Sequence, residues 1–395
     1  IPGRLAIGHT RSATCGEYNS VNLQPLVAET RCGMLALAHV GHITNAPELR
    51  RTLERRGAKF QSEIDSEVIL QLIAHSRRPS LEGAFVECLG MLEGAYSFVV
   101  LAKGQLIVAR DRRGFRPLVY GKLENSGEEA WVFASETCCL DIVGAAPEGE
   151  VEPGEFVLVK DHGQPLKRFF ASPQPGGPCA FEHVYVSRPD SVTFGRSVED
   201  SRHDLGRRLA REHPVSADIV VGVPDSGIQA AIGYAAESGI PYGVGVIRNH
   251  YVGRMMIEPR VKIRNLWTKV KFNPVRTVVE GKRVVLVDDS IVRCLTAPKL
   301  VGLLREAGAR EVHLCISCPP IVSPCFFGVS MPPRQQLAAA AMPIPEIRAK
   351  TGADSLGFLS LEETQRAIGD QQGQYCYSCW TGEYPIRVPL AQIGS

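Results

Sequence analysis

The stretch Arg283-Val-Val-Leu-Val-Asp-Asp-Ser-Ile-Val-Arg293 is the strongest indication of fold class in the second half of this sequence. Its four consecutive apolar residues indicate a buried strand, and two adjacent acids, Asp288 and Asp289, follow it directly. Ligands of open α/β sheets bind at the carboxyl ends of the strands, where adjacent carboxylates suit a divalent cation or ribose hydroxyls. The next loop offers backbone N–H groups ahead of a helix, which suits a phosphate. From the residues alone, the alternative is that the two acids simply cap that helix.

Strands and helices alternate on both sides of this stretch. Further strands are expected at Asp218–Val223, Gly243–Ile247 and Val312–Ile316, and helices with one apolar face at Ile228–Ala235 and Lys299–Gly308. The alternation predicts an α/β domain with a parallel sheet and crossover helices, which we place at residues 179–395.

The first half of the sequence has a different pattern. Short apolar runs that indicate strands lie at Leu35–His39, Tyr96–Leu101, Gln105–Ala109 and Trp131–Ala134. One amphipathic helix is expected near residues 66–76. These features predict an α+β domain over residues 1–170, and the turn-rich segment Ser172–Pro178 separates it from the second domain.

The composition is that of a globular protein and gives no sign of a nucleic-acid or membrane partner. The chain has 395 residues, 44% of them hydrophobic, and a formal net charge of +2. Nucleic acids and membranes would favour a concentrated basic face, and no apolar run approaches the length of a membrane span. The first residues lack the apolar core of a secretory signal, so we expect a cytoplasmic location.

Three segments of the second half resemble the substrate motifs of glutamine phosphoribosylpyrophosphate (PRPP) amidotransferases, which carry a type I phosphoribosyltransferase domain. Val287-Asp-Asp-Ser-Ile-Val-Arg293 resembles the PRPP-binding motif, Gly222-Val-Pro-Asp-Ser-Gly227 the pyrophosphate loop, and Asn249-His-Tyr-Val-Gly-Arg254 the loop that closes over PRPP. The PRPP-binding residues that this resemblance implies are Asp225, Ser226, Arg254, Asp288, Asp289, Ser290, Arg293 and Thr296. It further implies a Mg²⁺ ion held by Ser226, Asp288 and Asp289.

The sequence departs from the family in the phosphate loop. The family continues Arg-Gly-Thr-Thr-Ser, whereas this chain reads Arg293-Cys-Leu-Thr-Ala297. Glycine is used where the backbone bends sharply or approaches a ligand closely. We therefore expect Cys294 to strain or crowd the loop. Leu295 and Ala297 remove two hydroxyl groups and leave Thr296, so we expect PRPP binding to be weakened rather than lost.

Three segments of the first half resemble the N-terminal-nucleophile glutaminase domain of the same family. They are Ile7-Gly-His-Thr-Arg11, Ala38-His-Val-Gly-His-Ile-Thr-Asn45 and Ile64-Asp-Ser-Glu-Val-Ile69. The resemblance implies a glutamine site in which Arg11 binds the α-carboxylate, Asp65 binds the α-amino group and Gly41 also contacts glutamine. Binding a carboxylate through two parallel hydrogen bonds suits a guanidinium group.

The glutamine-cleaving nucleophile of this class is a thiol at the first residue, with the free α-amino group as its base. Residue 1 is Ile1, and Cys15 matches no nucleophile, so we expect an incomplete domain without its first strand. Val40 also replaces the family's Asn before Gly41, and loss of such a donor costs about 10²–10³ in rate. We expect an N-terminally truncated, divergent member whose glutaminase half is inactive.

Twelve cysteines in a cytosolic protein need an explanation other than disulfides. Two C-x₂-C pairs, Cys315 with Cys318 and Cys376 with Cys379, have the spacing of a structural zinc site. Cys315 lies in an expected strand, where residues three apart point to opposite faces, so we favour core packing for the first pair. The family resemblance instead implies a structural [4Fe–4S] cluster held by Cys179, Cys325, Cys376 and Cys379.

The resemblance implies an enzyme of purine synthesis. It would convert PRPP and ammonia, normally supplied by glutamine, to 5-phosphoribosylamine and pyrophosphate. We expect PRPP, glutamine or ammonia, and feedback purine nucleotides as ligands, and a homo-oligomeric assembly. The alternatives are a non-catalytic PRPP- or nucleotide-binding regulator and a scaffold partner of intact subunits, both on the same fold. A DNA-binding version would need a helix-turn-helix or a basic stripe, and we find neither.

Overall fold

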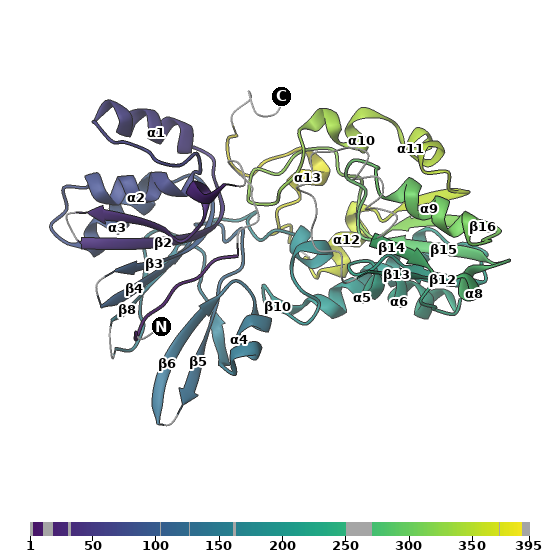
Figure 1. Cartoon of the computed structure of the whole chain (residues 1–395), viewed down its shortest axis with the longest axis horizontal. Helices are drawn as coiled ribbons and strands as arrows, with labels where there is room; N and C mark the ends of the chain where they lie inside the picture. The colour runs from purple at the N-terminus through teal and green to yellow at the C-terminus, as the bar shows by residue number, and fades with distance from the viewer. Residues whose placement is uncertain are drawn as a thin grey trace.

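The chain folds into two lobes that lie side by side, each with its own sheet (Figure 1). The computed structural model describes residues 3–10, 19–30, 33–102, 104–125, 127–160, 163–249, 271–370 and 372–388. Within these ranges, none of the helices combines the length and the apolar character needed to cross a membrane.

The first lobe is built on a six-stranded antiparallel sheet with the strand order β1-β2-β3-β4-β8-β9. Its strands are β1 (Leu26–Thr30), β2 (Gly33–Ile43), β3 (Gly94–Ala102), β4 (Gln105–Arg110), β8 (Glu155–Lys160) and β9 (Leu166–Phe169). Three helices pack on it: α1 (Ala46–Arg55), α2 (Ser66–His75) and α3 (Leu81–Met91). The apolar residues of α2, among them Val68, Ile69 and Ile73, are fully buried against this sheet, as their spacing predicts.

A smaller sheet completes the first lobe. It has the order β6-β5-β7, with β5 (Val119–Asn125), β6 (Glu128–Ala134) and β7 (Ala146–Glu150), and α4 (Thr137–Val143) packs against it. The short helix η1 (Ser20–Asn22) precedes β1.

The second lobe has a parallel four-stranded sheet with the order β12-β15-β16-β17. These strands are β12 (Ile219–Gly222), β15 (Arg283–Asp288), β16 (Glu311–Ile316) and β17 (Ser355–Phe358). Its longer helices are α5 (Val198–Glu212), α6 (Ile228–Ser238), α9 (Ala297–Glu306), α11 (Ile344–Thr351) and α12 (Leu361–Ala367). Val284, Val285, Leu286 and Val287 are fully buried, as expected for a strand covered on both faces.

The expected strand at Gly243–Ile247 is not a member of this parallel sheet. Tyr242 makes a single parallel bridge to Val220 of β12. The chain then leaves the sheet, and β13 (Val246–Arg248) pairs antiparallel with β14 (Phe272–Pro274). Around Tyr242 the chain lies beside β12, with hydrogen bonds from Val220 to Pro241 and from Gly243 to Val220, both at 2.9 Å. Gly243 approaches β12 so closely that a Cβ on it would lie 2.6 Å from the Ile219 side chain, and the backbone hydrogen bonds of the following residues go to β14 instead.

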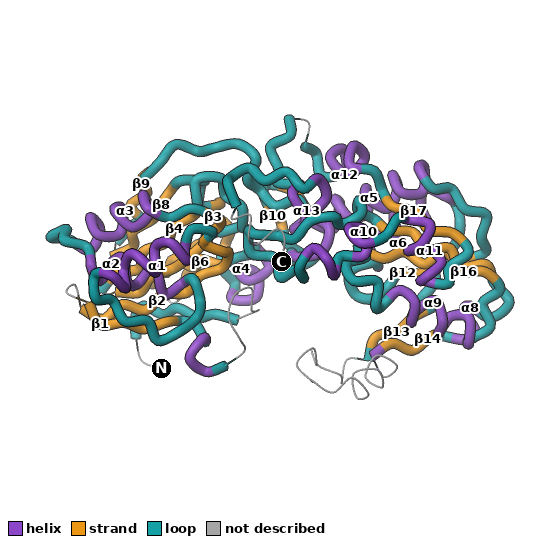
Figure 2. The backbone as a smooth tube through the Cα atoms, turned by 90° about the horizontal axis from the view of Figure 1, so that it is seen from above, coloured by secondary structure: helices purple, strands orange, loops and turns teal. Residues whose placement is uncertain are grey.

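Short elements of the second lobe connect the larger ones. They are η2 (Glu182–Val186), β10 (Val192–Thr193), β11 (Arg196–Ser197), α8 (Arg276–Val279), η3 (Arg334–Gln336), α10 (Ala338–Ala341) and α13 (Ser378–Thr381). In both views α13 lies between the two sheets (Figure 2). The segment around it therefore belongs to the region where the lobes meet.

Candidate functional site

The acids that follow β15 lie together at the carboxyl end of the parallel sheet. Asp288 and Asp289 are 7% and 6% exposed. The backbone N–H of Asp289 donates to Asp288 Oδ1 at 2.9 Å. Ser290 Oγ donates to Asp289 Oδ1 at 2.5 Å, and Ser226 Oγ donates to Asp289 Oδ2. The structure thus brings four of the predicted PRPP residues into one cluster.

Both carboxyl groups resist ionisation in the absence of a cation. Burial raises the pKa of Asp288 well above its ordinary value, and the charge of Asp289 raises it further. Burial also raises the pKa of Asp289, although hydrogen bonds from Ser226 and Ser290 oppose this. Two buried carboxyls of raised pKa are stabilised as anions by a divalent cation, which reverses the local electrostatics.

The loop before α6 packs directly against the end of β15. A Cβ on Gly227 would lie 2.6 Å from the carbonyl oxygen of Val287, so only glycine allows this approach. The close packing places Ser226 beside Asp289. Asp225, also predicted to bind PRPP, is more than half exposed and forms an ion pair with Arg248 of β13.

The loop between β15 and α9 presents the remaining predicted residues to solvent. Arg293 and Thr296 are both exposed. Thr296 is the N-cap residue of α9, and its side chain makes no capping hydrogen bond. The N-terminus of α9 therefore keeps the open polar character that suits a phosphate. Arg254 lies outside the described residues.

A second cluster lies on β2 of the first lobe and contains two of the predicted glutamine residues. Asp65 is 7% exposed, and its Oδ2 accepts the N–H of Ile43 at 2.7 Å. The same oxygen lies 3.5 Å from His42 Nδ1. Gly41 precedes this pair with φ of +140°, and a Cβ there would lie 2.1 Å from the carbonyl oxygen of Ala95. Arg11 lies outside the described residues.

Sequence reasoning assigned no role to His39, although the structure buries it beside this site. Its Nδ1 lies 2.9 Å from Ser66 Oγ, and its Nε2 lies 3.4 Å from the carbonyl oxygen of Ala95. Burial lowers the pKa of His39, so the ring is held neutral. The alternation of β2 was the available signal, because it places His39 on the same side of the strand as Gly41.

The four predicted cluster cysteines surround one cavity where the lobes meet. Cys179, Cys325, Cys376 and Cys379 all line one small cavity of about 10 Å³. All four are free thiols. A parallel bridge joins the backbones at Cys179 and Cys376, and Cys325 Sγ accepts the N–H of Phe327 at 3.3 Å. Among the described residues, no three His, Cys, Asp or Glu side chains are close enough to hold one metal ion.

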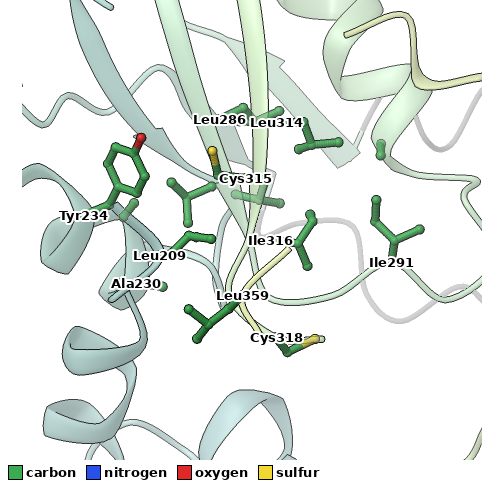
Figure 3. Packing of buried hydrophobic residues seen from close by; sticks show 14 of the residues in the cluster. Leu209, Ala230, Tyr234, Leu286, Ile291, Leu314, Cys315, Ile316, Cys318 and Leu359 are labelled. Atoms are coloured by element: carbon green, nitrogen blue, oxygen red, sulfur yellow. The ribbon is translucent and has the colours of Figure 1, made fainter. Parts of the chain in front are cut away.

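The other cysteine pair belongs to the core of the second lobe. Cys315 and Cys318 are 1% and 0% exposed and pack among aliphatic side chains. Figure 3 shows them well apart, with Cys315 beside Tyr234 and Cys318 beyond Leu359. Core packing, which the strand geometry favours, is therefore the arrangement found.

Comparison with known proteins agrees with this geometry. A family model described as a glutamine amidotransferase domain matches residues 9–141. The chain is 48% identical to amidophosphoribosyltransferase 2, chloroplastic, of Arabidopsis thaliana over 98% of this chain and 68% of that protein. It is 45% identical to the amidophosphoribosyltransferase of Bacillus subtilis over 98% of this chain and 82% of that protein. The chain belongs to the amidophosphoribosyltransferase family.

Solved structures of amidophosphoribosyltransferases have the same fold. The glutamine PRPP amidotransferase of B. subtilis, solved with ADP and GMP, superposes with a TM-score of 0.89 at 44% identity, covering 97% of this chain and 84% of that chain. A structure described as the allosteric regulatory enzyme of purine biosynthesis gives 0.90, also at 44% identity, over 97% of this chain and 83% of that chain. The expected glutaminase-like and type I phosphoribosyltransferase folds are confirmed. The chain is an enzyme of purine biosynthesis, and a non-catalytic regulator or scaffold is not favoured.

The two lobes of this amidophosphoribosyltransferase are in contact between the cysteine cavity and strand β2 of the glutamine site. One contact is between aromatic rings and the other is between backbones. Phe327 stacks on Phe115 with ring centroids 4.2 Å apart. The next residue, Gly328, has φ of +99°, and a Cβ on it would lie 2.8 Å from the Cα of Gly41. Gly328, three positions after the cavity cysteine Cys325, therefore lies in backbone contact with Gly41.

The departure from the family motif is visible in the backbone. Cys294 has φ of +53°, one of two non-glycine residues with positive φ among the described residues, and it is 3% exposed. A side chain in this region costs roughly 1–2 kcal/mol relative to ordinary backbone. The expected strain at Cys294 therefore has a structural basis.

We expect Cys294→Gly to strengthen PRPP binding several-fold, measured by calorimetry in the presence of Mg²⁺. The change relieves the strain of positive φ and removes a buried thiol beside the phosphate loop. Its net effect on unfolding should stay within about 1 kcal/mol, because glycine also gains entropy in the unfolded chain. Cys294→Ala is the matched control, since it removes the sulfur but keeps the Cβ. Equal binding by the glycine variant and the unchanged chain would contradict the strained-loop interpretation.

Proposed function

We propose that this chain forms 5-phosphoribosylamine and pyrophosphate from PRPP and ammonia, and that Asp288, Asp289, Ser226, Ser290 and the start of α9 form its PRPP site. The observation that carries the proposal is the buried acidic pair at the carboxyl end of β15, next to an open helix N-terminus. The acids suit the cation and ribose of PRPP, and the helix start suits its 5-phosphate. Asp225, Arg254, Arg293 and Thr296 complete the proposed set.

The donor set suits Mg²⁺, with Asp288, Asp289 and Ser226 as its protein ligands. Magnesium takes oxygen ligands and is usually held by one or two carboxylates together with substrate phosphates and water. When bound, the ion neutralises charge on the diphosphate that leaves the ribose. The protein supplies orientation, because the hydroxyls of Ser226 and Ser290 hold Asp289 from two sides.

We propose that Cys179, Cys325, Cys376 and Cys379 hold a [4Fe–4S] cluster. Four thiols around one cavity suit a cluster with four cysteine ligands drawn from distant segments. Apolar residues such as Phe181, Phe327 and Met331 line the rest of the cavity. The proposed role is structural, since Cys179 follows the linker between the lobes and the other three come from the end of the second lobe.

For glutamine, we propose that Asp65 binds the α-amino group, Gly41 contributes its backbone and Arg11 binds the α-carboxylate. Val40 is opposite Ser97 in the β2–β3 ladder and offers no side-chain donor where the family has asparagine. A missing oxyanion donor lowers the glutaminase rate by about 10²–10³. We therefore propose that ammonia is the better nitrogen donor for this chain.

The function is tested by measuring pyrophosphate release from PRPP and Mg²⁺ with either ammonia or glutamine. We expect turnover with ammonia, and a rate at least about 100-fold lower with glutamine. Cys15→Ala should leave both rates unchanged, because Cys15 matches no nucleophile. Equal rates with the two donors would contradict the role given to Val40. No pyrophosphate release with ammonia would refute the proposed activity itself.

We further propose that purine nucleotides bind this chain as feedback ligands and that the chain assembles with copies of itself. The support for the first is the B. subtilis relative, which was solved in complex with ADP and GMP. Calorimetry with these two nucleotides and light scattering of the purified chain test the two proposals separately.

A further inference from the structure

A buried arginine of the first lobe lies next to the proposed cluster ligands. Arg116 is 6% exposed and follows β4. Its backbone carbonyl accepts hydrogen bonds from Ser97 Oγ at 3.1 Å and Arg110 Nε at 2.9 Å. These bonds fix the base of the side chain within the first lobe, so the guanidinium projects from a rigid support.

The guanidinium forms an ion pair with Glu182 and keeps an unused donor within the part of the chain that the structure describes. Its Nη1 lies 3.0 Å from Glu182 Oε1, and Glu182 is itself fully buried. Among the described residues, neither Arg116 Nη1 nor Glu182 Oε1 makes a hydrogen bond, and Arg116 Nε has no hydrogen-bond partner. Glu182 therefore accounts for part of the charge of Arg116 but leaves a buried N–H donor unsatisfied. Such donors are rare in native proteins and indicate a missing partner.

Contacts on both sides of Arg116 place it beside the cluster site. The N–H of Cys179 donates to the carbonyl oxygen of Phe115, the residue before Arg116, at 3.1 Å. The N–H of Glu182, the ion-pair partner of Arg116, donates to the carbonyl oxygen of Cys179 at 3.1 Å. Phe115 also stacks on Phe327, which lies two residues after Cys325 and lines the cavity. Arg116 is thus held next to the segments that carry two of the four cavity cysteines.

Resting on the proposed cluster, we propose that Arg116 is a positioning residue for it, which balances its negative charge and donates Nε–H toward a cysteine sulfur. A [4Fe–4S] centre with four thiolates is an anion, and a buried anion requires a compensating cation. Hydrogen bonds to the sulfurs and nearby charge set the reduction potential of such clusters. Because Arg116 comes from the first lobe and Cys325 from the second, the cluster would also join the two lobes through this contact.

Two variants that differ only at residue 116 isolate the contribution of this arginine. They are Glu182→Gln and Glu182→Gln/Arg116→Met, so that neither leaves an unpaired buried carboxylate. Arg208→Met is a matched control, because Arg208 pairs with Asp204 and Glu363 rather than with the cysteines. Each protein is purified without oxygen, its iron and acid-labile sulfide are measured, and its reduction potential is followed by electron paramagnetic resonance.

We expect full iron content in Glu182→Gln and a more negative reduction potential in the double variant, because the reduced cluster loses its cation and hydrogen bond. Arg116→Lys, which keeps the charge without Nε, should shift the potential in the same direction by less, and Arg208→Met should not shift it. Equal reduction potentials in Glu182→Gln and the double variant would overturn the proposed role of Arg116 but not the proposed cluster. Absence of iron and sulfide from the unchanged chain would overturn the cluster and this inference together. If the double variant does not fold, the potential of Arg116→Lys decides, and no shift would overturn the inference.

Discussion

A chain carrying Asp288→Asn and Asp289→Asn is expected to bind PRPP at least about 100-fold more weakly than the unchanged chain when Mg²⁺ is present, a loss of about 2.8 kcal/mol. The substitutions keep the shape of both side chains but remove the charge that would hold the cation. Ser226 and Ser290 bond to different oxygens of Asp289, so after Asp289→Asn one hydroxyl can donate to the amide oxygen and the other can accept from the amide N–H. The loss should therefore be one of cation and substrate binding, measured by calorimetry with and without Mg²⁺.

The same change is expected to stabilise the ligand-free protein near neutral pH. Burial raises the pKa of both carboxyls, so the folded chain binds more protons than the unfolded chain. Stability contributed by such groups is present at low pH and is lost as pH rises above the ordinary carboxyl pKa. The Asp288→Asn/Asp289→Asn variant does not lose stability in this way as pH rises. In the unchanged chain, bound Mg²⁺ should restore the stability that is lost. Thermal unfolding at pH 5 and pH 8, with and without Mg²⁺, measures both effects.

Asp218→Asn is the matched control for this experiment. Asp218 is a carboxylate at the opposite end of the same strands, where it pairs with Arg283 at 2.9 Å and is more than one-third exposed. Its removal should leave PRPP binding unchanged and alter stability little, as is usual for exposed ion pairs. Equal PRPP binding by the Asp288→Asn/Asp289→Asn protein and the unchanged chain would show that the substrate binds elsewhere.

The acidic pair shows how far the sequence could predict this site. A strand that is buried on both faces appears in the sequence as a run of apolar residues. The position where β15 ends, and where the two acids follow it, could therefore be predicted without the structure. The position of Ser226 came only from resemblance, because its contact with Asp289 depends on the packing of Gly227 against Val287.

Other features depend on packing that periodicity does not encode. The segment from Gly243 has the composition of a strand of the parallel sheet, yet it leaves that sheet after one bridge and pairs with β14. The positive φ of Cys294 could be predicted from the sequence, because the family motif has glycine at this position and glycine is the residue that readily adopts positive φ. Arg116 and Glu182 gave no sequence signal, since a buried ion pair between distant segments has no fixed spacing.

Substituting Cys325 by serine is expected to abolish the iron–sulfur cluster, whereas the same substitution at Cys315 should leave it intact. Iron and acid-labile sulfide in protein purified without oxygen measure the difference directly. Cys325 lines the cavity, and its sulfur accepts the N–H of Phe327. Cys315 packs beside Tyr234 in the core of the second lobe (Figure 3) and is not among the residues that line that cavity.

Loss of the cluster should also weaken the junction between the lobes. Phe327 follows Cys325 closely and stacks on Phe115 of the first lobe, and Gly328 contacts Gly41. We therefore expect Cys325→Ser to lower the unfolding temperature and to expose the junction to proteolysis. Cys315→Ser places a hydroxyl in the core and should cost only about 1–2 kcal/mol without either effect at the junction.

The substitution Cys179→Ser distinguishes between two hypotheses, an iron–sulfur cluster and a zinc site built on the two C-x₂-C pairs. Both sites would use Cys376 and Cys379, but only the cluster would use Cys179. We expect brown protein that bleaches in air, and loss of colour and iron in Cys179→Ser. Colourless protein with stoichiometric zinc that survives Cys179→Ser and is lost in Cys315→Ser would contradict the cluster. The distinction bears on function, because an air-sensitive cluster at the junction would make the lifetime of the folded enzyme depend on oxygen, whereas zinc has no redox chemistry.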